Sequence, residues 1–483
     1  MGNGKKHFEN DVDGYFLDVP ADYSVHMGHA DVFALLKNDT TRIEIYREPA
    51  ANQEERDIYI GYSNRFLENT ADYTAEQQTT EQFGDNYAFV TAWKREKITA
   101  LEKDYNFFVS LDMFMEGNIF SLFIKSTEPI DKEEYAAIAA SFGVMAITKE
   151  YTPPQTAAAD IAARQWNKET EEFYRRCFAE NTELIWGLFD QEFCDFHFDQ
   201  YQEIEERLDY DFPVMIWYNN IAPEPNFTYW HNLLNESYKR GKVLELTLQT
   251  TDAETGSGNM IYRVLNGEYD NYLDHYAQTI ADFGHPVLFR LANEMNGDWC
   301  AYSGFQTGKD TLVYREFYRY VYEKFEKAGA NKNVIWVWNP NGRSMPPFSW
   351  NDAFMYYPGD PYVDIVGMTA YNTGTYYAEI GERWETFHQL YADLYQNYSQ
   401  RFGQPLMITE FASASAGGDK AHWISNMFQQ IRFFPRIKMA VWWSYCDYDT
   451  DGTIARSYFI NESEEVLDAF YKGLHHKQTR FFE

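Results

Sequence analysis

Short apolar runs alternate with amphipathic helical patterns through the last two thirds of the chain. Most of these runs are apolar throughout instead of alternating, which is typical of parallel strands covered by helices. They fall at residues 184–189, 214–218, 243–248, 287–291, 334–338, 365–369, 406–409 and 439–443. The clearest helical pattern, TLVYREFYRYVYEKFEK at residues 311–327, is ended by Gly329. Eight such units predict an α/β fold, a (β/α)8 TIM barrel, and not an open doubly wound sheet.

Residues 1–150 have a different pattern, which predicts an N-terminal α+β domain. Short strands are expected at residues 15–19, 32–36 and 42–46. Residues 105–115 and 119–125 alternate apolar and polar positions around Glu-Gly-Asn, which favours a hairpin. Helical spacing follows at residues 131–142, with Asp131 as the expected N-cap.

A Pro- and Ala-rich stretch, YTPPQTAAAD, separates the two patterns. We place a linker at residues 151–162 and the barrel domain at residues 163–483, opened by a helix over about residues 161–180. The opening YFLDVPADYSV, the meander and the closing helix weakly resemble domains related to the photosystem PsbP protein. This accessory domain either binds a sugar or a partner or only packs on its neighbour, and we favour packing.

Composition narrows the possible functions. Net charge is −33, which argues against nucleic acid or an anionic membrane as partner, although acidity also serves solubility. Aromatic residues make up 18% of the chain, which fits a large core, sugar stacking or both. No GxGxxG follows a strand and none of the four cysteines forms a CxxC, so we expect no cofactor and no metal.

Location and assembly are less constrained by the sequence. The first residues, MGNGKK, lack the apolar core of a signal peptide, and no run is apolar enough to span a membrane. We expect a secreted or cell-surface protein, with a cytoplasmic location as the alternative. Oligomeric state and the pairing of the cysteines stay open.

The stretch at residues 285–299, HPVLFRLANEMNGDW, holds the strongest chemical signal. An apolar strand ends in Arg290 and Glu294, four residues apart, and these would share a face if the strand reached that far. Charges at the end of a buried strand are costly unless they are paired or used. A position at the carboxyl end of a barrel strand is where barrel enzymes place their catalytic groups.

The seventh strand supplies a second carboxylate, Glu410, at the end of LMITEF. Glycoside hydrolysis needs two such groups, one to protonate the leaving oxygen and one to attack the anomeric carbon. Arg290 would keep Glu410 ionised. Asn293 is expected to hydrogen-bond a sugar hydroxyl, and Tyr371 is expected to donate to Glu410. The tryptophans are candidate surfaces on which the sugar rings stack. The candidate substrate-binding residues are Arg290, Asn293, Trp299, Tyr371, Trp443 and Trp338.

Each of these residues also has an ordinary structural explanation. A glutamate after an apolar strand is more often a solvated loop residue or a helix cap than a catalyst. Arg290 would then neutralise a core carboxylate, the three tryptophans would belong to the core, and Tyr371 would only begin a turn. The two glutamates are persuasive together because retaining barrel glycosidases use the fourth and seventh strands.

The segment RLANEMNGDW resembles glycoside hydrolase family 26, a family of β-mannanases with some mixed-linkage β-glucanases and β-xylanases. Residues 314–342 and 356–372 and the Glu410 segment resemble the same family, so the likeness covers most of residues 165–475. It implies a retaining hydrolase of β-mannan or a related β-glycan, with Glu294 as acid/base and Glu410 as nucleophile. Retention goes with carboxyls ~5–5.5 Å apart, and inversion with a separation near ~9 Å.

Two positions depart from the family pattern. The family usually has His before the acid, where this chain has Asn293, and often Asp two residues before the strand-six Tyr, where it has Thr369. Mixed-linkage β-glucan and β-xylan therefore remain alternative substrates. Two other classes of protein also remain: a catalytically silent glycan-binding barrel, and a metal-dependent barrel enzyme, which would need clustered ligands at strand ends that here lack His.

Overall fold

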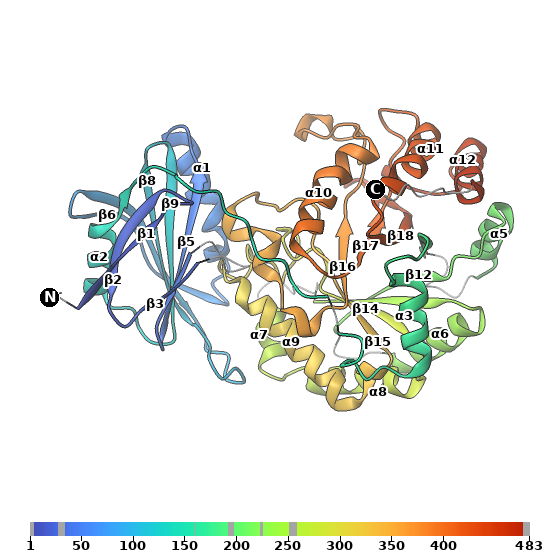
Figure 1. Cartoon of the computed structure of the whole chain (residues 1–483), viewed down its shortest axis with the longest axis horizontal. Coiled ribbons are helices and arrows are strands. Elements are labelled where there is room, and N and C mark those ends of the chain that lie inside the picture. Colours follow the sequence, from blue (N-terminus) through green and yellow to red (C-terminus); the bar gives the residue numbers. More distant parts are fainter. Residues whose placement is uncertain are drawn as a thin grey trace.

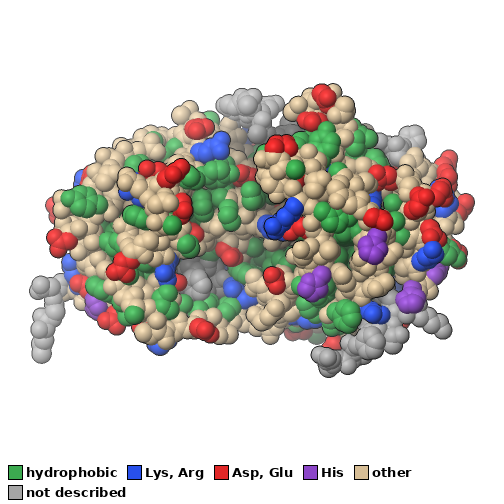
Figure 2. Space-filling view, turned by 90° about the horizontal axis from the view of Figure 1, so that it is seen from above, with side chains coloured by type: hydrophobic (Ala, Val, Ile, Leu, Met, Phe, Trp, Pro, Cys, Tyr) green, Lys and Arg blue, Asp and Glu red, His purple; other side chains and the backbone are tan. Residues whose placement is uncertain are grey.

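The chain folds into a sheet-rich N-terminal part and a barrel, joined by an extended segment that crosses from one to the other (Figure 1). The computed structural model describes residues 4–27, 34–158, 160–191, 198–222, 226–250 and 258–476. No helix within these ranges is long and apolar enough to cross a membrane. Lys and Arg side chains are dispersed among Asp and Glu on the face seen in Figure 2.

The N-terminal part is built on an antiparallel sheet of order β3-β4-β5-β9-β8-β7-β6 beside a small sheet of order β1-β2-β10. The strands of the large sheet are β3 Ser24–Met27, β4 Ala34–Lys37, β5 Thr41–Pro49, β6 Tyr73–Phe83, β7 Asn86–Arg95, β8 Phe107–Met115 and β9 Asn118–Ser126. The small sheet and the helices are β1 Lys5–Asn10, β2 Tyr15–Pro20, β10 Gly143–Val144, α1 Gln53–Ser63, η1 Arg65–Glu68 and α2 Lys132–Ser141.

The predicted hairpin is present, with Met115 paired to Asn118 across a two-residue turn. Both turn residues, Glu116 and Gly117, have positive φ (49° and 70°), as a type I′ turn requires. Asp131 caps α2 as predicted, accepting a hydrogen bond from the Glu133 backbone N–H. The predicted strand at 32–36 begins outside the described residues and continues as β4.

Eight parallel strands close into the predicted barrel in sequence order, β11 to β18, with β18 pairing β11. They are β11 Ile185–Asp190, β12 Val214–Asn220, β13 Val243–Gln249, β14 Val287–Leu291, β15 Val334–Trp338, β16 Ile365–Thr369, β17 Leu406–Phe411 and β18 Ile437–Ser444. Each apolar run predicted as a barrel strand is one, to within a few residues. A hairpin, β19 Cys446–Tyr448 and β20 Ile454–Ser457, follows the last strand.

Helices surround the barrel strands (Figure 1). They are α3 Lys168–Phe178, α5 Phe198–Leu208, α6 Phe227–Lys239, α7 Met260–Leu265, α8 Asp270–Phe283, α9 Thr311–Ala328, α10 Phe387–Arg401, α11 Lys420–Gln430 and α12 Glu464–His475. Short 3-10 turns lie at Ala330–Lys332, Ser349–Asn351, Ala353–Tyr356, Asp360–Tyr362, Ala378–Ile380 and Ile431–Phe433. The helix expected from residue 161 starts only at Lys168, because Asn167 caps it through the Thr170 N–H.

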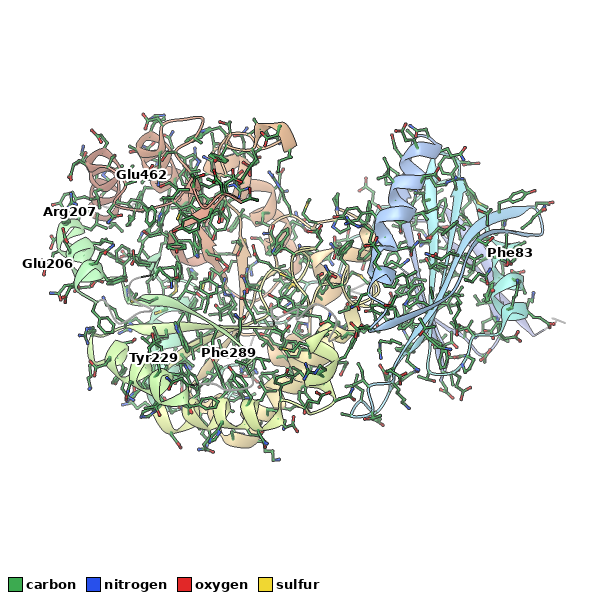
Figure 3. The ribbon with its side chains drawn as sticks, turned by 180° about the vertical axis from the view of Figure 1, so that it is seen from behind. Phe83, Glu206, Arg207, Tyr229, Phe289 and Glu462 are labelled. Carbon is green, nitrogen blue, oxygen red and sulfur yellow. The ribbon has the colours of Figure 1, made fainter. Side chains whose placement is uncertain are left out.

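The central strands of the large N-terminal sheet are buried on both faces. Ile45 and Ile124 belong to a core of the N-terminal domain, whereas their neighbours Tyr46 and Phe123 belong to a core that is continuous with the barrel. Successive strand residues point to opposite faces, so one face packs inside the domain and the other on the barrel. Figure 3 shows Phe83 on the outer part of this domain and Phe289 in the barrel domain, where its ring packs against Phe325 of α9. The N-terminal domain thus packs on the barrel.

Candidate active site

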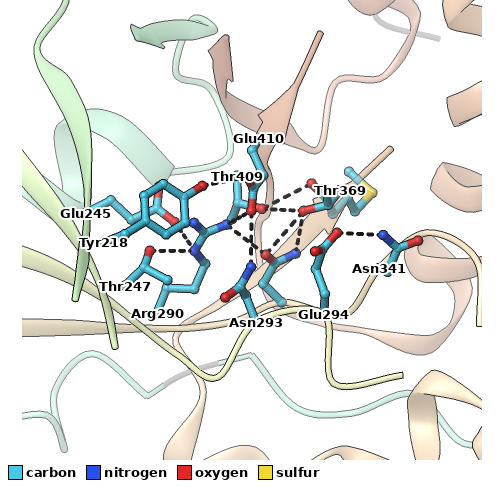
Figure 4. Close-up of polar contacts among 12 residues, drawn as sticks. Tyr218, Glu245, Thr247, Arg290, Asn293, Glu294, Asn341, Thr369, Thr409 and Glu410 are labelled. Atoms are coloured by element: carbon cyan, nitrogen blue, oxygen red, sulfur yellow. Dashed lines mark hydrogen bonds and ion pairs between the residues drawn. The ribbon is translucent and has the colours of Figure 1, made fainter. Parts of the chain in front are cut away.

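Glu410 stands at the end of β17 and is almost fully buried, with 5% of its surface exposed. Two donors reach its Oε1: Arg290 Nη1 at 2.6 Å and Asn293 Nδ2 at 3.2 Å. Two phenols reach its Oε2: Tyr218 at 2.5 Å and Tyr371 at 3.0 Å. Four donors and no acceptor surround this carboxyl in the part of the chain that is described, an environment suited to the anion. Figure 4 shows Tyr218, Arg290 and Asn293 around it.

Arg290, fully buried on β14, is the residue through which several strands meet. Its Nε donates to Thr247 Oγ1 at 2.9 Å and lies 3.1 Å from Glu245 Oε1, and its Nη1 donates to Asn339 Oδ1 at 3.0 Å. These contacts come from β13 and from the end of β15. Arg290 is therefore fixed in position by buried partners on both sides, and it presents Nη1 to Glu410.

The premise that Arg290 and Glu294 share a strand face is wrong. Strand β14 ends at Leu291, and the chain then turns through Ala292 (φ 46°) and Glu294 (φ 56°), a left-handed conformation that non-glycine residues adopt at a cost. The Glu294 N–H donates to the Asn339 carbonyl at 2.7 Å. This turn, and not strand alternation, carries Glu294 to the mouth of the barrel.

The carboxyl of Glu294 has a different environment from that of Glu410. Its Oε1 accepts from Asn341 Nδ2 at 2.6 Å. Burial, and next to it the charge of Glu410, raises the pKa of Glu294 to about 7. Two carboxyls whose environments favour opposite protonation states are the arrangement that separates an acid from a nucleophile.

The shape of the loop after Glu294 depends on two small residues, Asn296 and Gly297. Asn296 holds the neighbouring loop, because its Oδ1 accepts from the Asn341 N–H at 2.8 Å and its Nδ2 donates to the Asn341 carbonyl at 2.9 Å. At Gly297 a Cβ atom would lie 2.4 Å from the ring of Trp299. Glycine is therefore needed for Trp299 to fold back over the loop, and Trp299 keeps 54% of its surface exposed.

Most of the residues predicted to bind substrate surround this centre. Tyr371 and Asn293 contact Glu410 directly, and Trp443 lies edge-on to Tyr371 with ring centroids 6.0 Å apart. Trp338 is the exception: it is fully buried and packs against Tyr357 and Phe402, with ring centroids 5.2 and 5.4 Å away. Its side chain belongs to the packing around the barrel, so the prediction that Trp338 binds substrate is wrong.

Several residues of the centre escaped the sequence analysis. They are Tyr218, Glu245, Thr247 and Asn341. Glu245 offered a signal, since it is a lone carboxylate inside the apolar run VLELTL. Within the described residues, no three His, Cys, Asp or Glu side chains are grouped so as to hold a metal ion. Cys177, Cys300 and Cys446 are free thiols, and Cys194 lies outside the described residues.

The fold and the site together define a β/α barrel with one glutamate after the fourth strand and one at the end of the seventh, the pair of groups that glycoside hydrolysis needs. Residues 225–434 of the chain match the sequence model of glycosyl hydrolase family 26.

The sequence is similar to several characterised proteins. It is 29% identical over 277 residues to Endoglucanase H of Acetivibrio thermocellus, covering 57% of this chain and 28% of that protein. It is 29% identical to a mannan endo-1,4-beta-mannosidase of Bacillus subtilis, in a match that covers 29% of this chain and 43% of that protein. It is 26% identical to Beta-1,3-xylanase TXYA of a Vibrio species, in a match that covers 31% of this chain and 28% of that protein. The chain spans less than half the length of each of these relatives.

Among solved structures, an endo-beta-1,4-mannanase of Cellulomonas fimi has the same fold, with a TM-score of 0.50 at 18% identity. The match covers 67% of this chain and 77% of that one. At this identity the likeness concerns the fold alone.

Proposed function

We propose that the protein is a retaining glycoside hydrolase that cleaves β-linked glycans. In the first step the Glu294 carboxyl gives its proton to the glycosidic oxygen, while a Glu410 oxygen bonds to the anomeric carbon and the leaving sugar departs as an alcohol. In the second step water attacks the anomeric carbon, its proton passes to Glu294, and Glu410 leaves as a carboxylate. The released sugar keeps its anomeric configuration.

The observation that carries this proposal is the environment of Glu410. Arg290 and the two phenols, Tyr218 and Tyr371, all donate to its carboxyl oxygens. Such donors hold an anion in place for attack and lose one interaction when that oxygen becomes an ester, which favours its later departure as a carboxylate. A carboxylate that served only as a surface charge would not require four donors.

The acid role of Glu294 is supported by its pKa of about 7, raised first by burial and then by the charge of Glu410. A carboxyl with this pKa is still largely protonated in mildly acidic water, as a general acid must be. Once Glu410 is esterified its charge is gone, which lowers the pKa of Glu294 and suits it to accept a proton from water. The same residue can therefore act as acid and then as base.

For the substrate we propose a β-mannan-type glycan attacked within the chain, with mixed-linkage β-glucan and β-xylan as alternatives. The names of the relatives include a mannosidase, an endoglucanase and a β-1,3-xylanase, so membership of the family alone does not choose among sugars. Asn293 stands directly before Glu294 in the sequence and contacts Glu410, at the position where the family usually has His. We infer that contacts near the leaving group differ from those of typical mannanases.

The experiment is incubation of the protein with β-1,4-mannan, mixed-linkage β-glucan, β-1,4-xylan and β-1,3-xylan, with product size followed over time. We expect one glycan to give mixed oligosaccharides early, as attack within chains does. Glu410→Ala should remove at least 99.9% of this activity, whereas Glu206→Ala, on the exposed side of α5, should leave it unchanged. A Glu410→Ala protein with normal turnover would refute the assignment.

A catalytically silent glycan-binding barrel is the competing function. It predicts binding of a glycan without release of products, and equal binding by the parent and Glu410→Ala. The paired environments of Glu294 and Glu410 favour the enzyme, because a binding protein has no need to separate the pKa values of two carboxyls.

We also propose that the protein acts outside the cell or at its surface, because a polysaccharide substrate would be met there. Separating culture medium, surface and cell contents of the source cells, and assaying glycan cleavage in each, would test this. Activity confined to the cell contents would contradict it.

A further inference from the structure

We propose that Tyr62 of the N-terminal domain is a positioning residue for the acid/base loop, so that this domain completes the leaving-group side of the active site. The inference rests on the proposed function, in which Glu294 protonates the leaving oxygen. It assigns the N-terminal domain a part in catalysis that packing alone would not give it.

The direct contact is a hydrogen bond from the Tyr62 hydroxyl, near the end of α1, to the carboxylate of Asp298. The Tyr62 ring packs against two aromatic rings of the barrel domain. Its centroid lies 5.1 Å from that of Phe305 and 6.2 Å from that of Phe348. Burial, with Asp298 next, raises the pKa of the Tyr62 phenol to about 12, so it stays a donor at any working pH.

Asp298 lies in the loop that holds the proposed acid. It stands between Gly297, over which the Trp299 ring folds, and Trp299 itself. Its backbone carbonyl accepts from Gln306 Nε2 at 2.9 Å, so the side-chain carboxylate is free to be held by Tyr62. A hydrogen bond between the Trp299 side chain and Glu294 also lowers the pKa of Glu294, against the larger effect of burial. The position of Asp298 therefore bears on Trp299 and, through it, on the proposed acid.

The end of α1 is a firm support for this contact. The next residue, Ser63, is buried, and its hydroxyl oxygen accepts from Trp350 Nε1 of the loop after β15 at 3.2 Å. Tyr59, one helical turn earlier, packs edge-on against Phe348 with centroids 4.7 Å apart. Because α1 is fixed to the barrel at these points, Tyr62 can restrain the loop instead of moving with it.

The loop belongs to the leaving-group side because it carries the acid. Loss of the Tyr62 hydroxyl should therefore impair the step that needs proton donation and spare a reaction that does not. A general loss of fold would impair both. This difference separates positioning from a merely structural role.

The test compares Tyr62→Phe with Tyr59→Phe. The control removes a hydroxyl from the same helix, but one that bonds Ser121 within the N-terminal domain. On the glycan that the parent cleaves, Tyr62→Phe should lower kcat/KM about three- to ten-fold, the worth of one hydrogen bond. On the 2,4-dinitrophenyl glycoside of the same sugar, whose leaving group needs no proton, it should match the parent. For Tyr59→Phe, the ratio of kcat/KM on the glycan to kcat/KM on the 2,4-dinitrophenyl glycoside should equal that of the parent.

The pH profile is an independent readout. Loosening Trp299 weakens a bond that lowers the pKa of Glu294, so the basic limb of kcat/KM should move to higher pH in Tyr62→Phe. Asp298→Asn keeps an oxygen acceptor and should retain most activity, whereas Asp298→Ala should resemble Tyr62→Phe without adding to it in the double variant. Equal losses on both substrates, or an unmoved pH profile, would overturn the inference. An inactive parent would instead refute the proposed function.

Discussion

Glu294 is the residue whose ionisation should control the pH dependence of the reaction. Its pKa is raised to about 7 by burial and by Glu410, and only its protonated form can donate to the leaving oxygen. We therefore expect kcat/KM to fall as pH rises through about 7. Measurement from pH 5 to 9 checks this, and a rate that stays constant up to pH 9 would exclude Glu294 as the acid.

Replacing the neighbouring charge should move the same pKa in a known direction. Glu410→Gln removes the charge that contributes to raising the pKa of Glu294, so that pKa should fall. A titration of the carboxyl carbons by NMR would follow it without any need for activity. Comparison with the double variant Glu410→Gln, Glu294→Gln identifies the Glu294 signal, and an unchanged or higher pKa would show that the two carboxyls do not interact.

Glu245 predicts a pH dependence of stability. It is fully buried and pairs with Arg290, whose Nε lies 3.1 Å from its Oε1, but neither oxygen accepts a hydrogen bond among the described residues. Burial outweighs the charge of Arg290 and raises the pKa of Glu245 to about 7. A carboxyl whose pKa is higher in the folded state binds more protons there, so its contribution worsens as pH rises from about 4.5 to 7. Glu245→Gln removes this penalty. Its melting temperature relative to the parent should therefore be higher at pH 8 than at pH 5, and calorimetry at both values would show any opposite trend.

At the scale of single residues, the sequence predicted the two glutamates and Arg290 because each follows or interrupts an apolar run. It did not predict Tyr218, which follows the apolar residues Val214 to Trp217 of its strand as a core tyrosine would. Trp338 was misassigned for a related reason: consecutive residues of a barrel strand point alternately inward and outward, and sequence position near the strand end does not tell which. Only the register of each strand against its neighbours in the closed barrel decides which side chains point inward.

At the scale of elements, the hairpin β19–β20 extends a row of aromatic rings away from the active site. Trp443 is followed by Tyr445, with centroids 5.7 Å apart, and Tyr445 by Tyr448 at 6.2 Å. Tyr448 has 54% of its surface exposed, so its ring is accessible to a ligand. Aromatic rings of this kind offer flat surfaces on which sugar rings stack.

We therefore expect Tyr448→Ala to lower kcat/KM on long oligosaccharides about five- to thirty-fold, the worth of ~1–2 kcal/mol of aromatic contact. Substrates too short to reach the hairpin should be unaffected. Tyr471→Ala, which removes an exposed tyrosine from α12, is the matched control and should change neither. A loss independent of substrate length would point to damage in the fold instead.

The same scale explains which elements the sequence predicted. Barrel strands are buried on both sides, so their apolar runs are visible. Strand β6, YTAEQQTTEQF, is an edge strand with mostly exposed side chains, and it shows no apolar alternation to detect. The loop that carries Glu294 could not be predicted either, because its left-handed turn depends on contacts with Asn339 of the next strand.

At the scale of the whole molecule, ion pairs buried between the two domains join them into one unit. Lys125 of β9 is fully buried, with its Nζ 2.9 Å from Asp310 at the start of α9 and 3.0 Å from Glu44 of β5. A buried charge that loses its partner is strongly unfavourable, so these groups depend on one another. Neither domain can leave the other without exposing or stranding such charges.

Lys125→Ala should therefore destabilise the whole protein and not the N-terminal domain alone. It leaves Glu44 and Asp310 buried without their shared cation, and removal of one partner of a buried pair costs about 3–5 kcal/mol. Lys132→Ala is the matched control, because Lys132 pairs with Glu81 at the exposed surface, where such a pair is worth about 0–1 kcal/mol. Chemical denaturation followed by tryptophan fluorescence and by glycan cleavage should give one coincident transition, shifted only in Lys125→Ala. Two separate transitions, with the barrel unaffected, would mean that the domains fold independently and that the buried ion pairs do not couple them.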